Sequence, residues 1–556
     1  MARGSDELVL LPLGGAGEIG MNLSLYGFGP PERRQWLAVD IGITFPNDLP
    51  GIEVGMPDVR FLEEERGNLL GIVLTHGHED HIGAVFDLWP RLHGVPVHAT
   101  PFTAALLEAK RAGEPGAPEV DLHVVPVGGR LRVGPFDVEF VPVAHSIPES
   151  HALAIRTPLG LVLHTGDWKL DPAPVVGPPT DQARLEALGR EGVRAVICDS
   201  TNALREGESP SEAEVARSLA ELIAAAPRRV AVTIFASNVA RIRAVAEAAR
   251  RADRQVVAIG RSMRRIIDVA RETGLLEGVA DFLDDQAYGY LPPDKVVALV
   301  TGSQGEPRAA LARIAAGDHP SVALSRGDRV IFSSRTIPGN ERAVGRVING
   351  LVRQGIEVVT DRTHLVHVTG HPRRGELRRL YEWLRPELVV PVHGEELHMA
   401  ENAAIARETG VRETAILRDG DVLRLAPGPA EVVDEAPTGL LVRDGALLIR
   451  GDDNALWERR KLAFAGTVTV SIVLTSRGEL AADPQACLTG LPEADGRGRA
   501  FLDIVLDAAE GVVDGLPKGK RRDGELVVDA VRRAVRAAVN EAWRKKPLCR
   551  VLVSYV

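Results

Sequence analysis

One short segment, "VLTHGHEDHIGAV" (73–85), constrains this chain more than any other feature. It follows an apolar, strand-like run and places His76, His78, Asp80 and His81 within six residues. Imidazole and carboxylate groups are the ligands expected for zinc and related divalent ions. On an extended turn, positions two apart point the same way, so His76 and His78 can share one ion. Asp80 and His81 follow one turn later and can face a second ion, so the segment predicts a paired metal site.

Four more candidate residues stand where an apolar run passes into a loop: Asp40, His145, Asp167 and His393. Loops at strand ends are where a rigid sheet can position reactive side chains. A single histidine is more often a core or surface residue than a ligand. Their recurrence at strand ends, together with the first segment, favours a metal site assembled from distant parts of the chain.

The pattern of apolar residues changes along the chain. The first part reads as short strands, then helices alternate with strands, which is typical of a parallel α/β layer. Histidine-bearing strand ends return near residue 356. We therefore expect a β-rich domain that is interrupted by an insert and then completed. The expected parts are 1–208 (β-rich domain), 209–355 (α/β insert), 356–447 (completion and linker) and 448–556 (a small α+β domain).

The first helix of the insert has a recognisable start. Ser209 is expected as its N-cap, with Pro210 in the first helical position and Glu212 completing a capping box.

With these residues in order, the chain resembles the metallo-β-lactamase superfamily. The resemblance implies an αββα sandwich holding two divalent ions, with zinc expected and manganese as the alternative. Neighbouring metal ions can activate water and stabilise an in-line displacement. A histidine at position 78, where redox di-iron members carry glutamate, favours hydrolysis. The implied assignments are His76, His78 and His145 for one ion, Asp80, His81 and His393 for the other, Asp167 as the bridge, and Asp40 as a brace for the ligand loop.

Three further segments resemble motifs A, B and C of the β-CASP branch, which acts on nucleic acids: "CDSTNA" (198–203), "VHVTGH" (366–371) and "PVHGE" (391–395). They carry Asp199, His371 and His393 respectively. A histidine in motif C goes with RNA substrates in that branch. Taken alone, Asp199 also fits a turn-former and His371 a helix cap. The combination with the metal motif favours the functional interpretation.

Segments such as "PLGGAGEIGMN" (12–22), "GDWKLDPAPV" (166–175) and "TGSQGEP" (301–307) resemble the bacterial RNase J family. That resemblance implies 5′-to-3′ exonuclease action on single-stranded RNA with 5′-monophosphate ends, endonuclease cutting, and a role in RNA maturation and decay. It also implies a homodimer or homotetramer and association with RNA-degradation proteins. His371, oriented by Asp199, is the candidate general acid. The candidate substrate-binding residues are Ser237, Asn238, His367 and Thr369.

The chain departs from the family after motif B, where Pro372, Arg373 and Arg374 replace small polar residues. Two interpretations are open. The arginines can bind phosphate as bidentate donors, or they can cap and solvate the helix that follows. The spacing in "RRGELRR" slightly favours the second interpretation.

Composition limits the surface charge and the cellular location that we expect. A net charge of −10 argues against a surface that is basic throughout, although local basic clusters remain. No apolar run approaches the length of a spanning helix and three scattered cysteines suggest no disulfide framework, so we expect a cytoplasmic protein without a membrane partner. A β-CASP nuclease for DNA and, less favoured, a small-molecule metallohydrolase are the rival functions.

Overall fold

The computed structural model describes residues 5–46, 48–92 and 94–556. The chain forms two compact units. The larger unit contains the residues up to Thr44 and Met56–Gly439, and the smaller contains Phe45–Gly55 and Leu440–Val556. No helix within the described ranges has the length and apolar character needed to cross a membrane.

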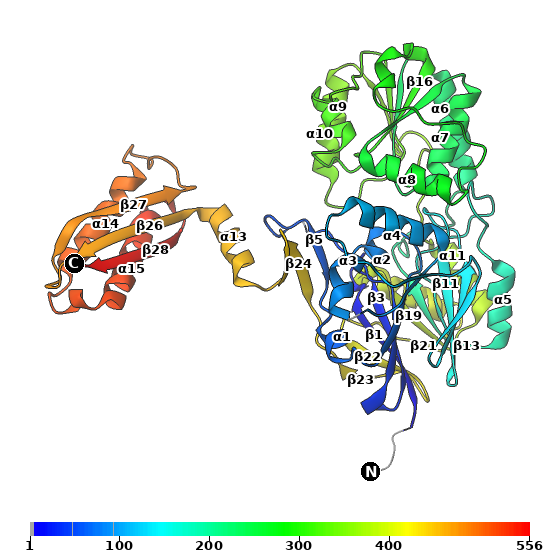
Figure 1. Ribbon diagram of the computed structural model, residues 1–556, viewed down its shortest axis with the longest axis horizontal. Helices are drawn as coiled ribbons and strands as arrows, with labels where there is room; N and C mark the ends of the chain where they lie inside the picture. The colour runs from blue at the N-terminus through cyan, green and yellow to red at the C-terminus, as the bar shows by residue number, and fades with distance from the viewer. Residues whose placement is uncertain (1–4, 47, 93) are drawn as a thin grey trace. The chain divides into compact units, whose positions relative to one another are not determined.

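Two mixed β-sheets form the centre of the larger unit (Figure 1). The first has, in spatial order, β23 (Glu431–Glu435), β22 (Asp421–Ala426), β1 (Glu7–Gly14), β3 (Leu23–Gly29), β4 (Gln35–Val39), β6 (Leu69–Val73), β7 (Val97–Ala99) and β8 (Leu122–Val124). The second has β21 (Glu413–Thr414), β19 (Leu388–Val392), β13 (Val193–Asp199), β12 (Gly160–His164), β11 (His151–Thr157), β10 (Phe136–Pro142) and β9 (Arg130–Val133). Each sheet thus combines strands from both sides of the insert.

The sheets enclose a shared apolar core. Leu10 and Tyr26 of the first sheet belong to the same buried cluster as Phe140, Ile155 and Ile197 of the second. The outer face of the second sheet packs on α5 (Gln182–Glu191), α11 (Arg374–Leu384) and α12 (Glu396–Glu408). Figure 1 places α1 (Arg60–Glu64), α2 (Glu79–Ile82), α3 (Val85–Leu88) and α4 (Pro101–Gly113) alongside the first sheet. The expected αββα sandwich is confirmed.

The insert is a separate parallel sheet with helices around it. Its strands lie in the order β15 (Gln255–Ile259), β16 (Val296–Val300), β14 (Val230–Thr233), β17 (Arg329–Phe332) and β18 (Glu357–Val359). Its helices are α6 (Glu212–Ala225), α7 (Val239–Arg251), α8 (Arg261–Glu272), α9 (Ala310–Ala316) and α10 (Glu341–Arg353). The expected α/β layer is confirmed. Because β18 lies beyond residue 355, the sheet of the insert extends into the segment that we assigned to the completed domain.

The start of α6 differs from the expectation. Its N-cap is Ser211, which forms the capping box with Glu214. The Ser209 hydroxyl instead donates to Glu376 at 2.9 Å, and the Ser209 N–H donates to the same carboxylate oxygen at 3.1 Å. The predicted box with Ser209 and Glu212 is therefore wrong, because a tertiary partner takes Ser209 and leaves Ser211 free to cap.

The smaller unit has its own core. The sheet β27 (Leu480–Thr489), β26 (Thr467–Leu474) and β28 (Leu548–Tyr555) packs on α14 (Phe501–Gly515) and α15 (Gly524–Trp543). Buried and half-buried residues alternate along β26, as expected for a sheet covered on one face. The hairpin β24 (Leu440–Asp444) and β25 (Leu447–Arg450) and helix α13 (Asn454–Ala465) precede that sheet. Leu49 and Ile52, from the early segment of this unit, pack with Val442 and Leu456.

Candidate metal centre and active site

The histidine-rich segment lies where β6 passes into α2. β6 is almost entirely buried, so the chain leaves the sandwich at a fixed point. His76 and His78 occupy the connecting loop, and His78 is the N-cap of α2. Asp80 and His81 lie in the first turn of that helix. A buried strand and a short helix therefore hold all four side chains.

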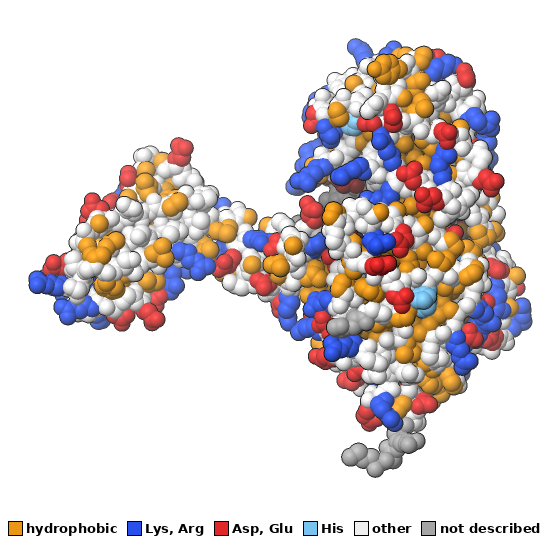
Figure 2. Space-filling view, in the orientation of Figure 1, with side chains coloured by type: hydrophobic (Ala, Val, Ile, Leu, Met, Phe, Trp, Pro, Cys, Tyr) orange, Lys and Arg blue, Asp and Glu red, His pale blue; other side chains and the backbone are white. Residues whose placement is uncertain are grey.

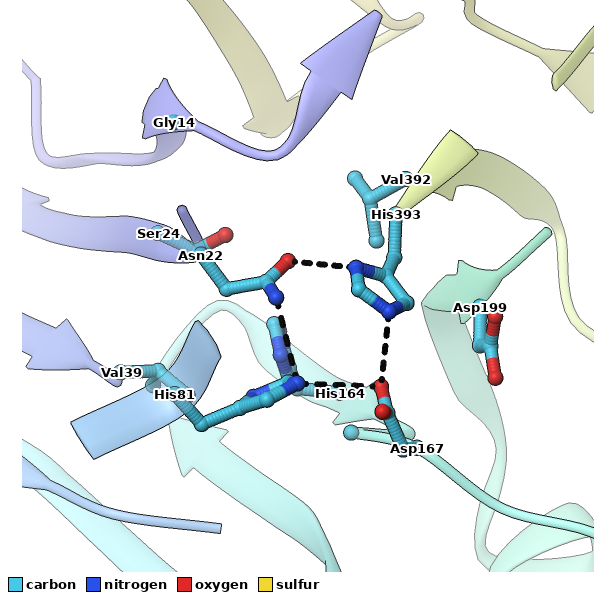
Figure 3. Close-up of a pocket in the computed structure, with 11 residues that line it drawn as sticks. Gly14, Asn22, Ser24, Val39, His81, His164, Asp167, Asp199, Val392 and His393 are labelled. Atoms are coloured by element: carbon cyan, nitrogen blue, oxygen red, sulfur yellow. Dashed lines mark hydrogen bonds and ion pairs between the residues drawn. The ribbon is translucent and has the colours of Figure 1, made fainter. Parts of the chain in front are cut away.

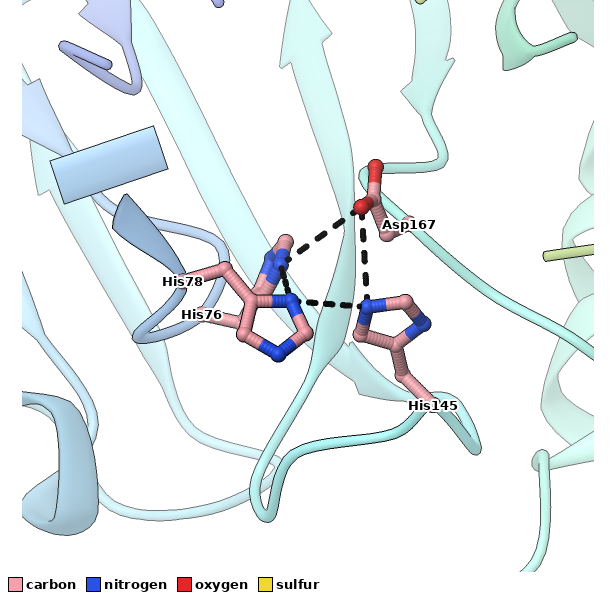
Figure 4. Close-up of side chains that lie close together, drawn as sticks. All are labelled: His76, His78, His145 and Asp167. Atoms are coloured by element: carbon pink, nitrogen blue, oxygen red, sulfur yellow. Dashed lines mark hydrogen bonds and ion pairs between the residues drawn. The ribbon is translucent and has the colours of Figure 1, made fainter. Parts of the chain in front are cut away.

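The first cluster of donor atoms comprises His76, His78, His145 and Asp167 (Figure 4). His78 Nδ1 lies 3.2 Å from His76 Nε2 and 3.0 Å from His145 Nε2. Asp167 Oδ2 lies 3.7 Å from His76 Nε2 and 3.5 Å from His145 Nε2. Three ring nitrogens and one carboxylate oxygen thus converge on one point.

The second cluster comprises Asp80, His81, Asp167 and His393. Asp167 Oδ1 lies 3.2 Å from His81 Nε2 and 3.6 Å from His393 Nε2. Asp80 Oδ2 lies 3.8 Å from His81 Nε2 and 3.7 Å from His393 Nε2. Figure 3 shows His81 and His393 turned towards Asp167 at the wall of a small cavity. Asp167 therefore gives one oxygen to each cluster.

The donor atoms fit divalent metal ions. Ligands about 2.0–2.1 Å from a tetrahedral ion stand roughly 3.3 Å apart, close to the separations in the first cluster. Asp167 Oδ1 and His393 Nε2 are buried, and neither has a hydrogen-bond partner within the described residues. Buried polar atoms without partners are costly. A cation between them satisfies both, so the structure fits two metal sites that share a carboxylate.

The histidines of the first cluster are held in the neutral form that binds metals. Burial keeps the pKa of His76 and of His145 well below the usual value, although the Asp167 carboxylate opposes the shift. Burial also lowers the pKa of His78 to about 4. Neutral imidazoles offer lone pairs at neutral pH.

The second cluster attracts positive charge. Burial alone disfavours a charged His81, but Asp167, Asp40 and Asp80 outweigh it and raise the His81 pKa well above its ordinary value. The surrounding carboxylates that favour a proton here also favour a cation in its place.

Asp40 braces both clusters from behind. Its Oδ2 accepts a hydrogen bond from His81 Nδ1 at 2.7 Å and one from the Thr75 hydroxyl at 2.8 Å. Since the Thr75 hydroxyl donates to Asp40, it accepts from His76 Nδ1, 3.0 Å away. Both rings are thus oriented with Nε2 towards the cluster atoms. Asp40 and His393 have positive φ angles of 63° and 52°, so backbone strain is concentrated at this site.

Replacement of Asp40 by alanine is expected to weaken metal binding by about 10- to 100-fold, because it frees two ligand rings to rotate. Competition with a chromophoric zinc chelator measures the change. Asp121→Ala, which removes a half-exposed carboxylate of the same unit, is the matched control. Equal zinc affinity in both variants contradicts the bracing role.

His371 lies beside the clusters and is paired with Asp199. Its Nδ1 lies 2.7 Å from Asp199 Oδ2 and 3.8 Å from Asp167 Oδ2. Burial alone lowers its pKa, but Asp199 and Asp167 outweigh burial and raise that pKa to about 9. The two carboxylates therefore favour the protonated ring. With Nδ1–H bonded to Asp199, Nε2–H remains to donate a proton.

Two asparagines for which the sequence predicted no role form hydrogen bonds with residues of the site. Asn22 Oδ1 lies 3.1 Å from His393 Nδ1, and Asn22 Nδ2 lies 3.1 Å from His81 Nε2. Asn202 Nδ2 donates to the His371 carbonyl at 3.4 Å and, by a shorter bond, to the Thr369 hydroxyl. Both residues lie inside segments quoted for the family resemblance, which was the available signal. Asparagine is so common in loops that its type alone indicates no role.

The predicted substrate-binding residues have different surroundings. Thr369 is next to the site, because its hydroxyl accepts the His371 N–H at 3.1 Å. The Asn238 side chain is occupied as the N-cap of α7, where it accepts the Arg241 N–H at 2.9 Å. His367 is largely buried with Nδ1 unpartnered among the described residues, and burial lowers its pKa to about 3. Ser237 precedes the cap and is half-buried.

The residues after motif B form the N-terminal end of the following helix, α11. Arg373 is the N-cap of α11, and its N–H donates to Glu376 at 2.8 Å. The Arg374 guanidinium contacts Glu206, Glu401 and Glu408, and its side chain is 13% exposed. The Arg374 guanidinium is thus already paired with carboxylates. This pairing favours a structural role for Arg374 over phosphate binding.

Models of four protein domains match the chain. The Ribonuclease J beta-CASP domain matches residues 227–351, and the Ribonuclease J C-terminal domain matches residues 454–556. A beta-lactamase superfamily domain matches residues 53–235. A Zn-dependent metallo-hydrolase RNA specificity domain matches residues 355–416.

Whole-chain relatives agree with these matches. Ribonuclease J of Sinorhizobium meliloti is 54% identical over 99% of this chain and 98% of its own length. Ribonuclease J of Thermus thermophilus is 36% identical over 98% of this chain and 91% of its own length. A solved structure from Enterococcus faecalis, described as a protein of unknown function, shares the fold with a TM-score of 0.52 at 16% identity. That match covers 75% of this chain and 100% of the solved one.

Proposed function

This chain belongs to the ribonuclease J family and is a metal-dependent ribonuclease, and we propose that it cleaves RNA between the Asp167-centred clusters and His371. The observation that carries this proposal is the position of His371. It is paired with Asp199 at 2.7 Å while it lies beside the carboxylate shared by both clusters. A proton donor and a metal-binding carboxylate therefore face the same space.

Zinc is the ion we propose for both sites, with manganese as the alternative. His76, His78 and His145 would hold one ion, while Asp80, His81 and His393 would hold the other, and Asp167 would contact both. Imidazole-rich donor sets suit zinc. When bound, two such ions activate water and offset negative charge on the phosphate.

The residues of the chain then position and protonate the leaving group. Hydrolysis that releases a 5′-nucleotide breaks the bond from phosphorus to the 3′-oxygen, so that oxygen must gain a proton. His371 Nε2 supplies the proton, and Asp199 holds the ring through Nδ1. Asn202 and Thr369 hold the backbone on either side of His371. Asp199 is a positioning residue in this scheme, and His371 is the general acid.

A more specific part of the proposal is the direction in which the RNA strand is degraded. We assign 5′-to-3′ exonuclease action with a preference for 5′-monophosphate ends, together with internal cutting. Thr369, His367, Ser237 and Asn238 are the residues proposed to meet the 5′ end. We also propose a homodimer or homotetramer that works in the cytoplasm alongside other RNA-degradation proteins.

One labelled RNA prepared with a 5′-monophosphate, a 5′-triphosphate or a 5′-hydroxyl tests this direction. Rapid release of mononucleotides from the monophosphate alone, followed by product size over time, is the expected result. A DNA strand of the same sequence is expected to remain uncut. Equal internal cutting of all three RNAs would overturn the 5′-end preference, and equal cutting of DNA would overturn the choice of RNA.

A further inference from the structure

Helix α13 of the smaller unit exposes two large aromatic rings to solvent. Trp457 is 54% exposed and Phe464 is 66% exposed. They are seven positions apart, so they lie on nearly the same face of the helix, about 10 Å apart along its axis. Of the twelve residues of α13, all of which the structure describes, only Leu456 and Ala465 are buried. The aromatic face is therefore not part of the core of the unit.

Lysine ammonium groups lie against both rings. Lys461 Nζ is 4.6 Å from the centroid of the Trp457 ring, and Lys545 Nζ is 4.6 Å from that of the Phe464 ring. Lys545 Nζ also lies 4.9 Å from the centroid of the Trp543 ring, and it donates to the Phe464 carbonyl at 2.9 Å. Rings and ammonium groups thus alternate in what we call the ring–lysine strip: Trp457, Lys461, Phe464, Lys545 and Trp543.

The two lysines of the strip have no carboxylate partner within the described part of the chain. Charged residues next to them on α13 do have partners: Arg460 pairs with Asp48 at 2.6 Å, and Glu458 pairs with Arg550 at 2.7 Å. Figure 2 shows Lys and Arg side chains gathered on the smaller unit next to α13. The strip therefore carries positive charge that an anionic partner can neutralise.

The alternation of rings and unpaired lysines suits a single-stranded nucleic acid. Bases stack on exposed aromatic rings while nearby cations meet the phosphates. Stacking a base on a ring is stronger than holding an exposed ammonium over it, so a base can displace each lysine and free its ammonium for a phosphate. Protein–protein interfaces are instead depleted of lysine. An RNA strand therefore fits this face better than a second protein surface does.

We propose that the ring–lysine strip is an RNA-binding site of the smaller unit. Bases of a single strand stack on Trp457 and Phe464, and the ammonium groups of Lys461 and Lys545 contact its phosphates. The inference rests on the proposed function only for the choice of RNA, and it involves no residue of the metal clusters. Because every base has a face that can stack, the strip is expected to bind RNA irrespective of sequence.

Photocrosslinking of the full-length chain tests the site directly. The protein is treated with a chelator so that RNA stays intact, and it is irradiated with a thiouridine-containing RNA of about 20 nucleotides. Mass spectrometry then locates the crosslinked residues. Crosslinks at Trp457 and Phe464 are expected, and the dependence of their yield on RNA concentration gives the Kd of this site. If no crosslink falls within residues 454–465, the proposal is wrong.

The variant Trp457→Ala tests base stacking. With one ring removed, the Kd read from the crosslink at Phe464 should rise at least about fivefold. An abasic strand of the same length keeps the phosphates, so its strength as a competitor should be the same in wild type and variant. Leu447→Ala, which removes a 65% exposed apolar side chain of the same unit, is the matched control. An unchanged Kd in Trp457→Ala, or an equal rise in the control, contradicts stacking.

The variant Lys461→Gln tests the phosphate contact. Loss of one such contact should reduce the slope of log K against log salt by about 0.7. Lys518→Gln removes the same charge from the same unit, but Lys518 is already paired with Glu479 at 3.3 Å, so the slope should not change. An unchanged slope in Lys461→Gln, or an equal loss in both variants, contradicts the contact.

Sedimentation of Trp457→Ala distinguishes RNA from a second copy of the chain. If the variant forms smaller oligomers than wild type and no RNA crosslink reaches α13, the strip is an interface between copies and the proposal is wrong. If the crosslinks appear as expected but metal-loaded protein leaves RNA uncut, this inference stands and the proposed function fails. If RNA is cut and α13 is not crosslinked, only this inference fails.

Discussion

Replacement of Asp167 by alanine is expected to abolish RNA hydrolysis, with a loss of at least roughly a thousandfold, because one carboxylate serves both clusters. Its two oxygens lie 3.2–3.7 Å from the nearest ring nitrogens of His81, His393, His145 and His76. Without it, each cluster loses a donor and the pair loses its shared negative charge. Cleavage of a 5′-monophosphorylated RNA and metal content by atomic absorption are measured on the same preparation.

Asp121→Ala is the matched control, since it removes a carboxylate that is 54% exposed, precedes the edge strand β8 and belongs to neither cluster. Circular dichroism of both variants checks that the fold is retained. If Asp167→Ala keeps both near-normal hydrolysis and a full metal content, the assignment of a shared bridging ligand is wrong.

The second large effect is expected for His371→Ala, which should lower kcat by about 10²- to 10⁴-fold while metal content stays at the wild-type level. The ring contacts Asp199 and lies close to Asp167, but the two principal clusters contain their donors without it. A loss of hydrolysis without a loss of metal is the result that separates a general acid from a ligand.

A modified substrate sharpens this prediction. When sulfur replaces the 3′-oxygen of the scissile bond, the leaving group departs without needing a proton. His371→Ala should then cleave nearly as fast as wild type. Asp199→Asn should resemble His371→Ala on ordinary RNA and recover in the same way on the sulfur substrate. If His371→Ala remains equally impaired on the sulfur substrate, His371 does not act as the general acid.

Much of the site could be predicted because several of its candidate ligands lie close together in the sequence. His76, His78, Asp80 and His81 fall within six residues, and this density is rare outside metal sites. His145, Asp167 and His393 could be proposed because each ends a readable strand. That the donor atoms of each cluster lie within 4.8 Å of one another depends on the packing of two sheets, which no single segment encodes.

The errors and omissions have a common physical cause. Both Ser209 and Ser211 have an acidic residue three positions later, so either fits a capping box by local pattern. The choice depends on Glu376, 167 residues away from Ser209, whose carboxylate takes that hydroxyl. Asn22 and Asn202 were missed for the same reason, since their role is defined by partners from distant segments. Local propensity cannot resolve such long-range competition.

Arg374, for which the sequence left phosphate binding and a solvated helix face open, also depends on partners from distant segments. The helix-like spacing around it favoured a solvated face, and the helix is there. The side chain is not free in solvent, however, because glutamates from two other segments surround it. Helical periodicity indicates which face a residue occupies but not which neighbour covers that face.

The division of the two clusters along the chain has a consequence for biosynthesis. His76, His78, His145 and Asp167 all precede the insert, whereas His393 follows it. β19, which ends just before His393, also fills the position between β13 and β21 in the second sheet. A nascent chain that has been translated only through the insert therefore carries every donor of one cluster and lacks a donor of the other. The donor set of the first site is therefore synthesised before that of the second, which is completed only after the ribosome has passed the whole insert.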